Sequence, residues 1–228
     1  MTGFCFDFCG ASLEADPSGA LIWPAADTLV VADLHFEKAT ALARAGHLLP
    51  PLDSRATLDN LGAVLKRFPA ARVICLGDSF HDPGGPGRLS REDRATLAKL
   101  MKGRDWIWIT GNHDPIQQEA LTAEAQTELT DGPLTFRHEA KAGAGPGEVS
   151  GHYHPKASLK QRGRRLKGRC FLLDDNRLIL PAFGAYTGGL DVTDPAMSGL
   201  IGEEARVLLI GRRAVHEIAY ARIEGHSA

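Results

Sequence analysis

The chain is organised around the stretch Trp106-Ile107-Trp108-Ile109-Thr110-Gly111-Asn112-His113-Asp114, which is followed directly by Pro115. Its first four residues form an uninterrupted apolar run, as expected for a strand that is buried on both faces. The run ends in an amide, an imidazole and a carboxylate. Functional groups gather at the carboxyl ends of strands in open α/β sheets. The stretch therefore predicts both a buried strand and a functional site, with Gly111 letting the chain turn between them.

Three other apolar runs end in the same way. Leu29–Ala32 runs into Asp33-Leu34-His35, and Val73–Leu76 runs into Gly77-Asp78. A third segment, Glu148–Ser150, leads into Gly151-His152-Tyr153-His154. If these strands lie side by side in parallel, their polar ends meet at one edge of the sheet.

Length and composition favour one globular domain covering residues 1–228. The chain is 43% hydrophobic, has a formal net charge of −2, and contains four scattered cysteines with no Cys-x-x-Cys pair. These features exclude a disulfide framework and a global attraction for nucleic acid. We see no apolar run of about 18 residues or more and no secretory signal, so we expect a cytoplasmic protein without a membrane partner.

The first half of the chain predicts alternating strands and helices. A β-hairpin precedes the buried strand at 28–32, residues 36–51 are partly helical, and 82–87 form a loop. A helix begins near Asp53 or Ser54 as the cap and stops at Pro69, and a second helix begins at a capping box that starts at Ser90. With strands at 72–76 and 106–109, this order predicts parallel pairing with right-handed crossovers.

The second half of the chain is richer in strand signals. A short helix is expected near 115–123. Strands are then expected at 134–138, 147–151, 169–173, 177–181, 206–210 and 214–222. The class is therefore α/β (α+β), with a second sheet packed on the first.

The polar groups at the strand ends form a set of candidate metal ligands. The set contains two carboxylates, one amide and up to five imidazoles: Asp33, Asp78, Asn112, His35, His113, His138, His152 and His154. Mixed oxygen and nitrogen donors suit manganese, iron or zinc better than calcium or magnesium. The donors are too many for one ion, whereas two ions about 3.5–4 Å apart that share a carboxylate would use them all.

In their order along the chain, these motifs resemble the signature of calcineurin-like metallophosphoesterases. The resemblance covers Asp33-Leu34-His35, Gly77-Asp78, Gly111-Asn112-His113-Asp114, one later histidine, and Gly151-His152-Tyr153-His154. It implies a four-layer αββα sandwich, in which two packed mixed β-sheets are flanked by helices.

The resemblance also implies a role for each matching residue. Asp33, His35 and His154 would hold the first metal, Asp78 would bridge, and Asn112, His138 and His152 would hold the second. His138 is assigned by elimination, because no local motif marks it. His113 would be catalytic, oriented by Asp114 or Asp82, and Asp114 is counted with it in the catalytic pair.

The expected reaction follows from these parts. A metal-bridging hydroxide would attack phosphorus in line, and both metals would neutralise the phosphoryl oxygens. His113 would protonate the leaving oxygen or stabilise its charge.

A closer resemblance covers most of the chain. The segments Asp33–Ala39, Gly77–Asp82, Gly151–Ala157 and Leu180–Gly189 are similar to the bacterial ligase-associated DNA damage response phosphoesterases. This branch implies a phosphodiesterase or nuclease that is activated by manganese and acts on DNA. It also implies partnership with a DNA ligase, a helicase and a second nuclease. From the residues themselves, we expect 181–189 only to form a tight return near the site.

Seven cations and no acid lie between residues 156 and 169: Lys156, Lys160, Arg162, Arg164, Arg165, Lys167 and Arg169. One interpretation is a solvated hairpin face, and the other is a patch that tracks phosphates beside the site. His81 either contacts substrate or is structural. The predicted substrate-binding set is Asn112, His81, Lys156, Arg162, Arg164 and Arg165.

Three functions stay open on these grounds. The first is a two-metal phosphodiesterase that acts on DNA. The second is a phosphomonoesterase or pyrophosphohydrolase acting on a small nucleotide or a lipid precursor. The third, an inactive scaffold on the same fold, is disfavoured because every ligand position is filled.

Overall fold

The structure is a computed structural model that describes residues 2–113, 125–161, 163–202 and 204–223. The helix expected near 115–123 and the side chain of Asp114 lie outside these residues. Among the described helices, none is both long and apolar enough to cross a lipid bilayer.

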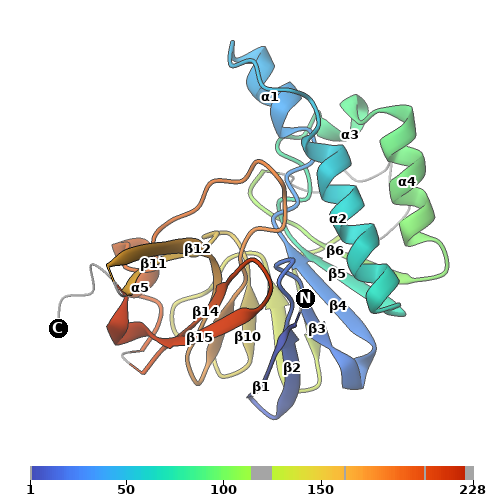
Figure 1. Ribbon diagram of the computed structural model, residues 1–228. Coiled ribbons are helices and arrows are strands. Elements are labelled where there is room, and N and C mark those ends of the chain that lie inside the picture. Colours follow the sequence, from blue (N-terminus) through green and yellow to red (C-terminus); the bar gives the residue numbers. More distant parts are fainter. Residues whose placement is uncertain (1, 114–124, 162, 203, 224–228) are drawn as a thin grey trace.

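One sheet contains the buried strands predicted from the first half of the chain (Figure 1). In spatial order its strands are β1 (Phe4–Phe8), β2 (Ala11–Ala15), β3 (Leu21–Trp23), β4 (Thr28–Ala32), β5 (Arg72–Leu76), β6 (Asp105–Ile109) and β7 (Ala125–Gln126). Strands β1 to β4 pair antiparallel, whereas β4 to β7 pair parallel. The register aligns Ala32 with Leu76 and Leu76 with Ile109. The three strands therefore end at the same level, and the polar residues that follow them share one edge.

Helices cover the outer face of this sheet. There α2 (Asp53–Arg67) and α4 (Arg91–Met101) lie side by side, whereas α1 (Lys38–Arg44) extends away beyond the sheet, with α3 (Gly85–Arg88) near it (Figure 1). Leu58, Leu61 and Val64 of α2 are buried in the apolar cluster that they form with the sheet. The capping prediction for Ser90 is confirmed, because its Oγ accepts a hydrogen bond from Asp93 N–H at 3.0 Å.

Three predictions in this half need correction. Asp53 and Ser54 do not cap α2, whose N-cap is Leu52. Their side chains instead bind the backbone N–H groups of Ala39 and Glu37 at the start of α1. The segment 82–87 is not all loop, because α3 begins at Gly85.

The helical segment predicted at 36–51 shrinks to α1. Phe36 before it is buried in the core, whereas residues 45–51 after it are exposed, including Leu48 at 87%.

The second sheet contains the remaining strands. These are β8 (Glu128–Asp131), β9 (Leu134–Arg137), β10 (Glu148–Ser150), β11 (Lys156–Gln161), β12 (Arg164–Leu173), β13 (Arg177–Ile179), β14 (Arg206–Ile210) and β15 (Val215–Ala219). Their spatial order is β15-β14-β12-β13-β10-β9-β8, with β11 paired to β12. Strand β10 pairs parallel with β9 and β13, and the other pairs are antiparallel. Strands β8 and β11 and the first part of β12 were missed because polar and basic residues dominate them.

The two sheets pack face to face through one apolar cluster. Val30 and Ile74 of the first sheet share this cluster with Phe136 and Phe171 of the second. The other face of the second sheet is covered by the short helix α5 (Pro195–Ser198), the turn η2 (Tyr220–Arg222) and connecting segments. A further turn, η1 (Pro24–Ala26), precedes β4. The predicted α/β class with two packed mixed sheets is confirmed, although the outer layer over the second sheet contains little helix.

Candidate metal centre

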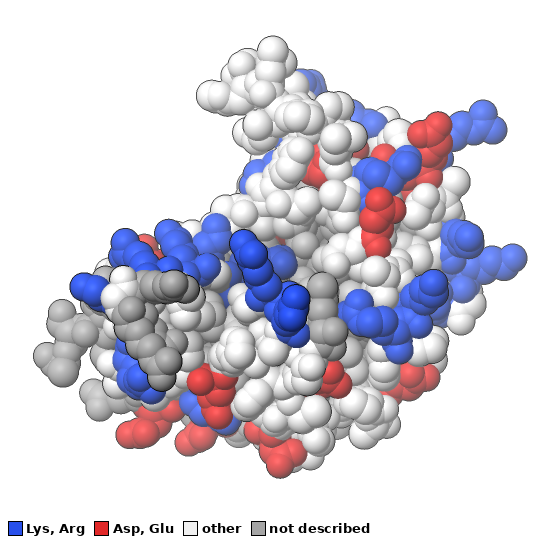
Figure 2. Space-filling model, in the orientation of Figure 1, with Lys and Arg blue, Asp and Glu red and all other residues white. Residues whose placement is uncertain are grey.

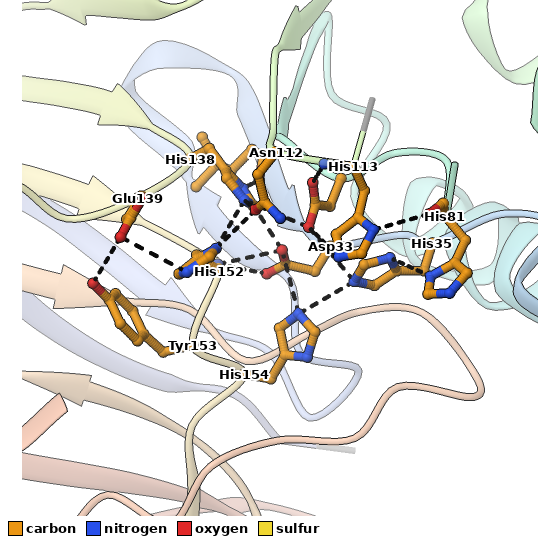
Figure 3. A network of polar contacts seen from close by, with 12 residues as sticks. Asp33, His35, His81, Asn112, His113, His138, Glu139, His152, Tyr153 and His154 are labelled. Atoms are coloured by element: carbon orange, nitrogen blue, oxygen red, sulfur yellow. Dashed lines mark hydrogen bonds and ion pairs between the residues drawn. The ribbon is translucent and has the colours of Figure 1, made fainter. Parts of the chain in front are cut away.

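The four polar strand endings meet in one cluster. Strands β4, β5, β6 and β10 bring together Asp33, His35, Asp78, Asn112, His113, His152 and His154, and the segment after β9 adds His138. Figure 3 labels all of these side chains except that of Asp78, and the labelled ones gather around one centre. Two groups of three have their ligand atoms within 4.8 Å of one another: Asp33, His35 and His154, and Asp78, His138 and His152.

The backbone at these positions is unusual. Five of the clustered residues have a positive φ that only glycine adopts readily: Asp33 (54°), His35 (44°), Asp78 (46°), His152 (69°) and His154 (50°). Such a conformation costs of order 1–3 kcal/mol per residue and persists only where the surroundings enforce it. Its concentration at one cluster indicates a functional site.

Each buried carboxylate is held by the backbone of a neighbouring loop. The N–H of His152 donates to Asp33 Oδ2 at 3.0 Å, and the N–H of His113 donates to Asp78 Oδ1 at 2.9 Å. Hydrogen bonds of this kind fix the direction of a ligating carboxylate. Residues from separate strands therefore orient one another.

The side chains of the first group lie close together. His154 Nε2 lies 3.3 Å from His35 Nε2 and 3.4 Å from Asp33 Oδ1. Burial lowers the pKa of His35 to about 2, and nearby His154 adds to the effect. His35 is therefore neutral at physiological pH, which is the form that binds a metal.

The second group contains acceptors that face each other. His138 Nδ1 lies 3.1 Å from the Leu76 carbonyl, which only accepts hydrogen bonds, so we assign the ring proton to Nδ1. The lone pair on Nε2 then faces Asn112 Oδ1 at 2.9 Å, with His152 Nδ1 at 3.1 Å. These inward-facing oxygen and nitrogen lone pairs are the donors that a divalent cation binds. The donor set therefore fits a metal.

Asp78 lies between the two groups. Its Oδ2 is 3.9 Å from His35 Nε2 and 3.5 Å from His138 Nε2. A single carboxylate can thus reach both groups.

His113 stands at the rim of the cluster, with its side chain 43% exposed. Its Nδ1 donates to the His81 carbonyl at 3.0 Å, and its Nε2 lies 4.0 Å from Asp78 Oδ2. The His81 ring stacks on the His113 ring with centroids 5.1 Å apart. A backbone carbonyl and a stacked ring therefore orient His113.

The expectation that Asp82 orients His113 is wrong. Asp82 forms a paired hydrogen bond with Arg88 at 2.9 and 2.8 Å, and this contact lowers the pKa of the Asp82 carboxyl. The other candidate, Asp114, is outside the described residues.

Gly111 is needed for space rather than for a turn. A Cβ at this position would collide with the carboxylate and backbone nitrogen of Asp78. The φ of Gly111 is not among the positive values. The glycine therefore lets the end of β6 approach the carboxylate that lies between the two groups.

Sequence reasoning missed several contributors to the site. Glu139 Oε1 lies 3.8 Å from His152 Nε2 and accepts a hydrogen bond from Tyr153 Oη at 3.5 Å (Figure 3). Its position next to His138 was the only signal. The carbonyls of Leu76 and His81 carry no side-chain signal at all.

The segment 181–189, whose role was left open, supports the first ligand loop. The N–H of Phe183 donates to the Ala32 carbonyl at 2.8 Å, and that of Gly184 donates to the Asp33 carbonyl at 3.1 Å. This segment therefore extends along the end of β4 and fixes the backbone of Asp33.

The basic run forms the hairpin of β11 and β12. Directly paired residues lie on the same face of such a hairpin, and the pairs Lys156–Arg169, Ser158–Lys167 and Lys160–Arg165 share one face. Figure 2 shows basic side chains gathered over this hairpin. The opposite face carries Ala157 and Leu159, which are buried.

Not all seven cations are available at the surface. The Arg169 guanidinium donates to the carbonyls of Ala182 and Ser18, and burial lowers its pKa, so it is structural. Arg162 and the side chain of Arg164 lie outside the described part of the chain. Lys160, Arg165 and Lys167 are exposed.

The fold and the two ligand groups define a metal-dependent phosphoesterase. The family profile described as calcineurin-like phosphoesterase matches residues 27–178, which include every clustered ligand. The chain belongs to this family, whose members use divalent metals and hydrolyse phosphoric esters.

Comparison with solved structures gives a second, more specific likeness. The Pseudomonas putida nuclease MPE superposes with a TM-score of 0.76 at 27% identity, covering 95% of this chain and 100% of that one. Yfce, a phosphoesterase from E. coli, gives a TM-score of 0.44 at 14% identity, covering 84% of this chain and 98% of that one. The search of curated protein sequences gave no match.

Proposed function

We propose that this phosphoesterase is a nuclease that cleaves phosphodiester bonds in DNA during repair. One observation carries the proposal: a hairpin with a cationic face begins at Lys156, two residues after His154 of the metal centre. A row of cations beside a hydrolytic site suits a polyanionic substrate. The likeness to a protein described as a nuclease supports the same function.

We assign the ligands to two metal positions. Asp33, His35 and His154 form the first, and Asn112, His138 and His152 form the second. Asp78 would supply its carboxylate to both positions, in keeping with its distances to His35 and His138. Two divalent ions, when bound, supply an activated water and neutralise charge on the phosphoryl oxygens.

The residues of the chain itself then have separate tasks. Asn112, which is exposed beside its ligand position, contacts the phosphate. His113 directs Nε2 toward the centre, because Nδ1 donates to the His81 carbonyl. From there the imidazolium form of His113, protonated on both nitrogens, would give its Nε2 proton to the leaving oxygen or stabilise the charge on that oxygen. His81, Lys156, Arg162, Arg164 and Arg165 complete the proposed substrate-binding set, and Asp114 is the proposed partner of His113.

Manganese is the metal we propose, with iron or zinc as alternatives. The donor set of carboxylates, one amide and imidazoles suits these borderline ions. We further propose that residues 1–228 act as one cytoplasmic domain, in company with a DNA ligase, a helicase and a second nuclease. The apolar cluster shared by the two sheets supports the single domain.

One activity panel tests the proposed function. The purified protein with Mn²⁺ is given a chromogenic phosphomonoester, bis(4-nitrophenyl) phosphate, single-stranded DNA and duplex DNA. We expect hydrolysis of the diester and cleavage of DNA. Preference for the monoester, with intact DNA, would contradict the nuclease and favour the small-molecule phosphatase.

A further inference from the structure

Two lysine side chains next to the metal centre belong to neither ligand group. Lys38 is the first residue of α1, three residues after His35, and Lys156 is the first residue of β11. The two elements lie apart in the fold (Figure 1). Both lysines are partly buried. In the described part of the chain, neither ammonium group has a hydrogen bond or an ion pair within 4 Å.

The charge of Lys38 acts on two imidazoles of the site, and the charge of Lys156 acts on Lys38. Burial is the main cause of the lowered pKa of His35 and His81, and the charge of Lys38 adds to it in both. Burial also lowers the pKa of Lys38, an effect that Asp53 opposes and Lys156 reinforces. His35 lies three residues before Lys38, and His154 lies two residues before Lys156. The Nε2 atoms of these two histidines are 3.3 Å apart, so both lysines follow loops that meet at the metal centre.

Lys38 is held in place by a buried network behind it. Glu37 has a φ of 64°, and its N–H donates to Ser54 Oγ at 2.9 Å. Ser54 Oγ donates to Glu37 Oε1 at 2.9 Å, and the N–H of Ala39 donates to Asp53 Oδ2 at 3.1 Å. The start of α2 thus fixes the backbone on both sides of Lys38.

Lys156 is held by the wall formed near residue 189. A Cβ on Gly189 would lie 2.9 Å from Lys156 Cε and would collide with the His154 carbonyl. The N–H of Lys156 donates to the Leu190 carbonyl at 2.9 Å. The missing side chain at Gly189 therefore makes room for the aliphatic stem of Lys156 next to a metal ligand.

We propose that Lys38 and Lys156 form a subsite for a DNA phosphate adjacent to the scissile phosphate. This proposal rests on the proposed nuclease function. It identifies the neighbouring phosphate as the part of the substrate that gives selectivity. Each lysine is partly buried, follows a candidate ligand and has no hydrogen-bond or ion-pair partner among the described residues, and a bound phosphate would supply one. A small chromogenic diester has no second phosphate to place there, so the subsite favours polynucleotides.

A cycle between enzyme and substrate variants tests the subsite. The substrates are a trithymidylate with two charged linkages and its two analogues, in which one linkage is a neutral methylphosphonate. The proteins are the wild type, Lys38→Met, Lys38→Arg and Lys156→Met, with Lys66→Met on the exposed face of α2 as the matched control. All are assayed with Mn²⁺, with bis(4-nitrophenyl) phosphate hydrolysis as the reference.

We expect the loss of kcat/KM from the enzyme change and the loss from the substrate change not to add, because both remove the same contact. In the wild type, one of the two analogues loses roughly tenfold in kcat/KM, mainly through KM, the size of one charge-assisted contact. Lys38→Met lowers kcat/KM on the charged trinucleotide, relative to the chromogenic diester, by a similar factor, and it makes the same analogue no worse than the parent. Lys38→Arg retains the preference, and Lys66→Met behaves as wild type.

Two other results would overturn the subsite. Analogue penalties that are equal in the wild type and Lys38→Met would show that Lys38 does not contact the neighbouring phosphate. Equal loss on the trinucleotide and the chromogenic diester would place Lys38 in the metal centre itself. Failure of the nuclease proposal looks different: the wild type would hydrolyse the chromogenic diester and leave every oligonucleotide intact, which removes the subsite as well.

Discussion

The metal centre and the basic hairpin are adjacent but built in opposite ways. In the centre, Asp33 and Asp78 are buried, and each is held by a backbone N–H from another strand. On the hairpin, Lys160 and Lys167 are exposed, and no described carboxylate pairs with them. Coupled, buried groups suit chemistry that depends on geometry, whereas solitary exposed cations suit a long-range attraction that tolerates many sequences.

The largest expected effect comes from breaking the centre at the residue that lies between its two groups. Asp78→Asn removes the shared charge but keeps an oxygen that can accept from His113 N–H. We expect kcat to fall by more than about 10³-fold on every substrate, because the carboxylate that both metal positions would share is lost. Steady-state kinetics with Mn²⁺ and metal content by mass spectrometry check this.

Thermal unfolding in chelator is the control for Asp78→Asn. It should be close to wild type if the fold is intact. Near-wild-type turnover would remove Asp78 from the centre.

The next largest effect on kcat is expected from His113, at the rim of the metal centre. His113→Ala should lower kcat by about 10²–10⁴-fold, the usual range for loss of a general acid. Because His113 is not among the proposed ligands, bound metal should stay at the wild-type level. A substrate with a good leaving group, such as bis(4-nitrophenyl) phosphate, should suffer less than DNA. The same loss on both substrates would contradict leaving-group assistance.

Removal of the metal tests the metal centre alone, because bound metal stabilises the folded protein through its ligands. A metal that binds only the folded protein stabilises it by about 2.7 kcal/mol at a free concentration 100 times its Kd. We therefore expect Mn²⁺ to raise the unfolding temperature of the wild type, and to raise that of Asp78→Asn much less. Differential scanning fluorimetry with and without chelator checks this, and an equal shift in both proteins would argue against the assigned ligands.

A smaller and more selective effect is expected on the hairpin. The double change Lys160→Glu and Lys167→Glu should lower kcat/KM on DNA by roughly tenfold at low salt. It should also reduce the slope of log(kcat/KM) against log[salt] by about 1 per lysine. The loss on a chromogenic diester should be smaller.

The matched control for the hairpin is Lys66→Glu with Lys99→Glu, on exposed faces of α2 and α4. If this control lowers DNA cleavage equally, the hairpin has no special role and net charge is the cause.

The smallest effect is expected far from both regions. Ser90→Ala removes the cap of α4 and should lower the free energy of unfolding by about 1 kcal/mol. Activity below the unfolding transition should be unchanged. Urea denaturation gives the first value, and the activity panel gives the second.

Much of the fold was predictable because its signals are local. The apolar runs at 28–32, 72–76 and 106–109 become β4, β5 and β6, and Ser90 caps α4 as expected. The prediction failed where tertiary contacts outweigh local preference. Ser54 bonds Glu37 instead of capping its own helix, and the strand formed by Lys156–Gln161 has only two apolar residues among its polar ones.

By itself, the sequence determined the candidate ligands, because each follows a strand-like run. Only the packing of the two sheets brings the ends of β4, β5 and β6 together with those of β9 and β10. Only the tertiary structure decided how those ligands are held. The Leu76 carbonyl sets the proton on His138, and the His81 carbonyl, not Asp82, orients His113. The placement of Lys38 and Lys156 after neighbouring ligands also depends on the fold, because the two lysines lie 118 positions apart in the sequence. A strand and its end are encoded locally, whereas a hydrogen bond between loops exists only once the sheets have packed.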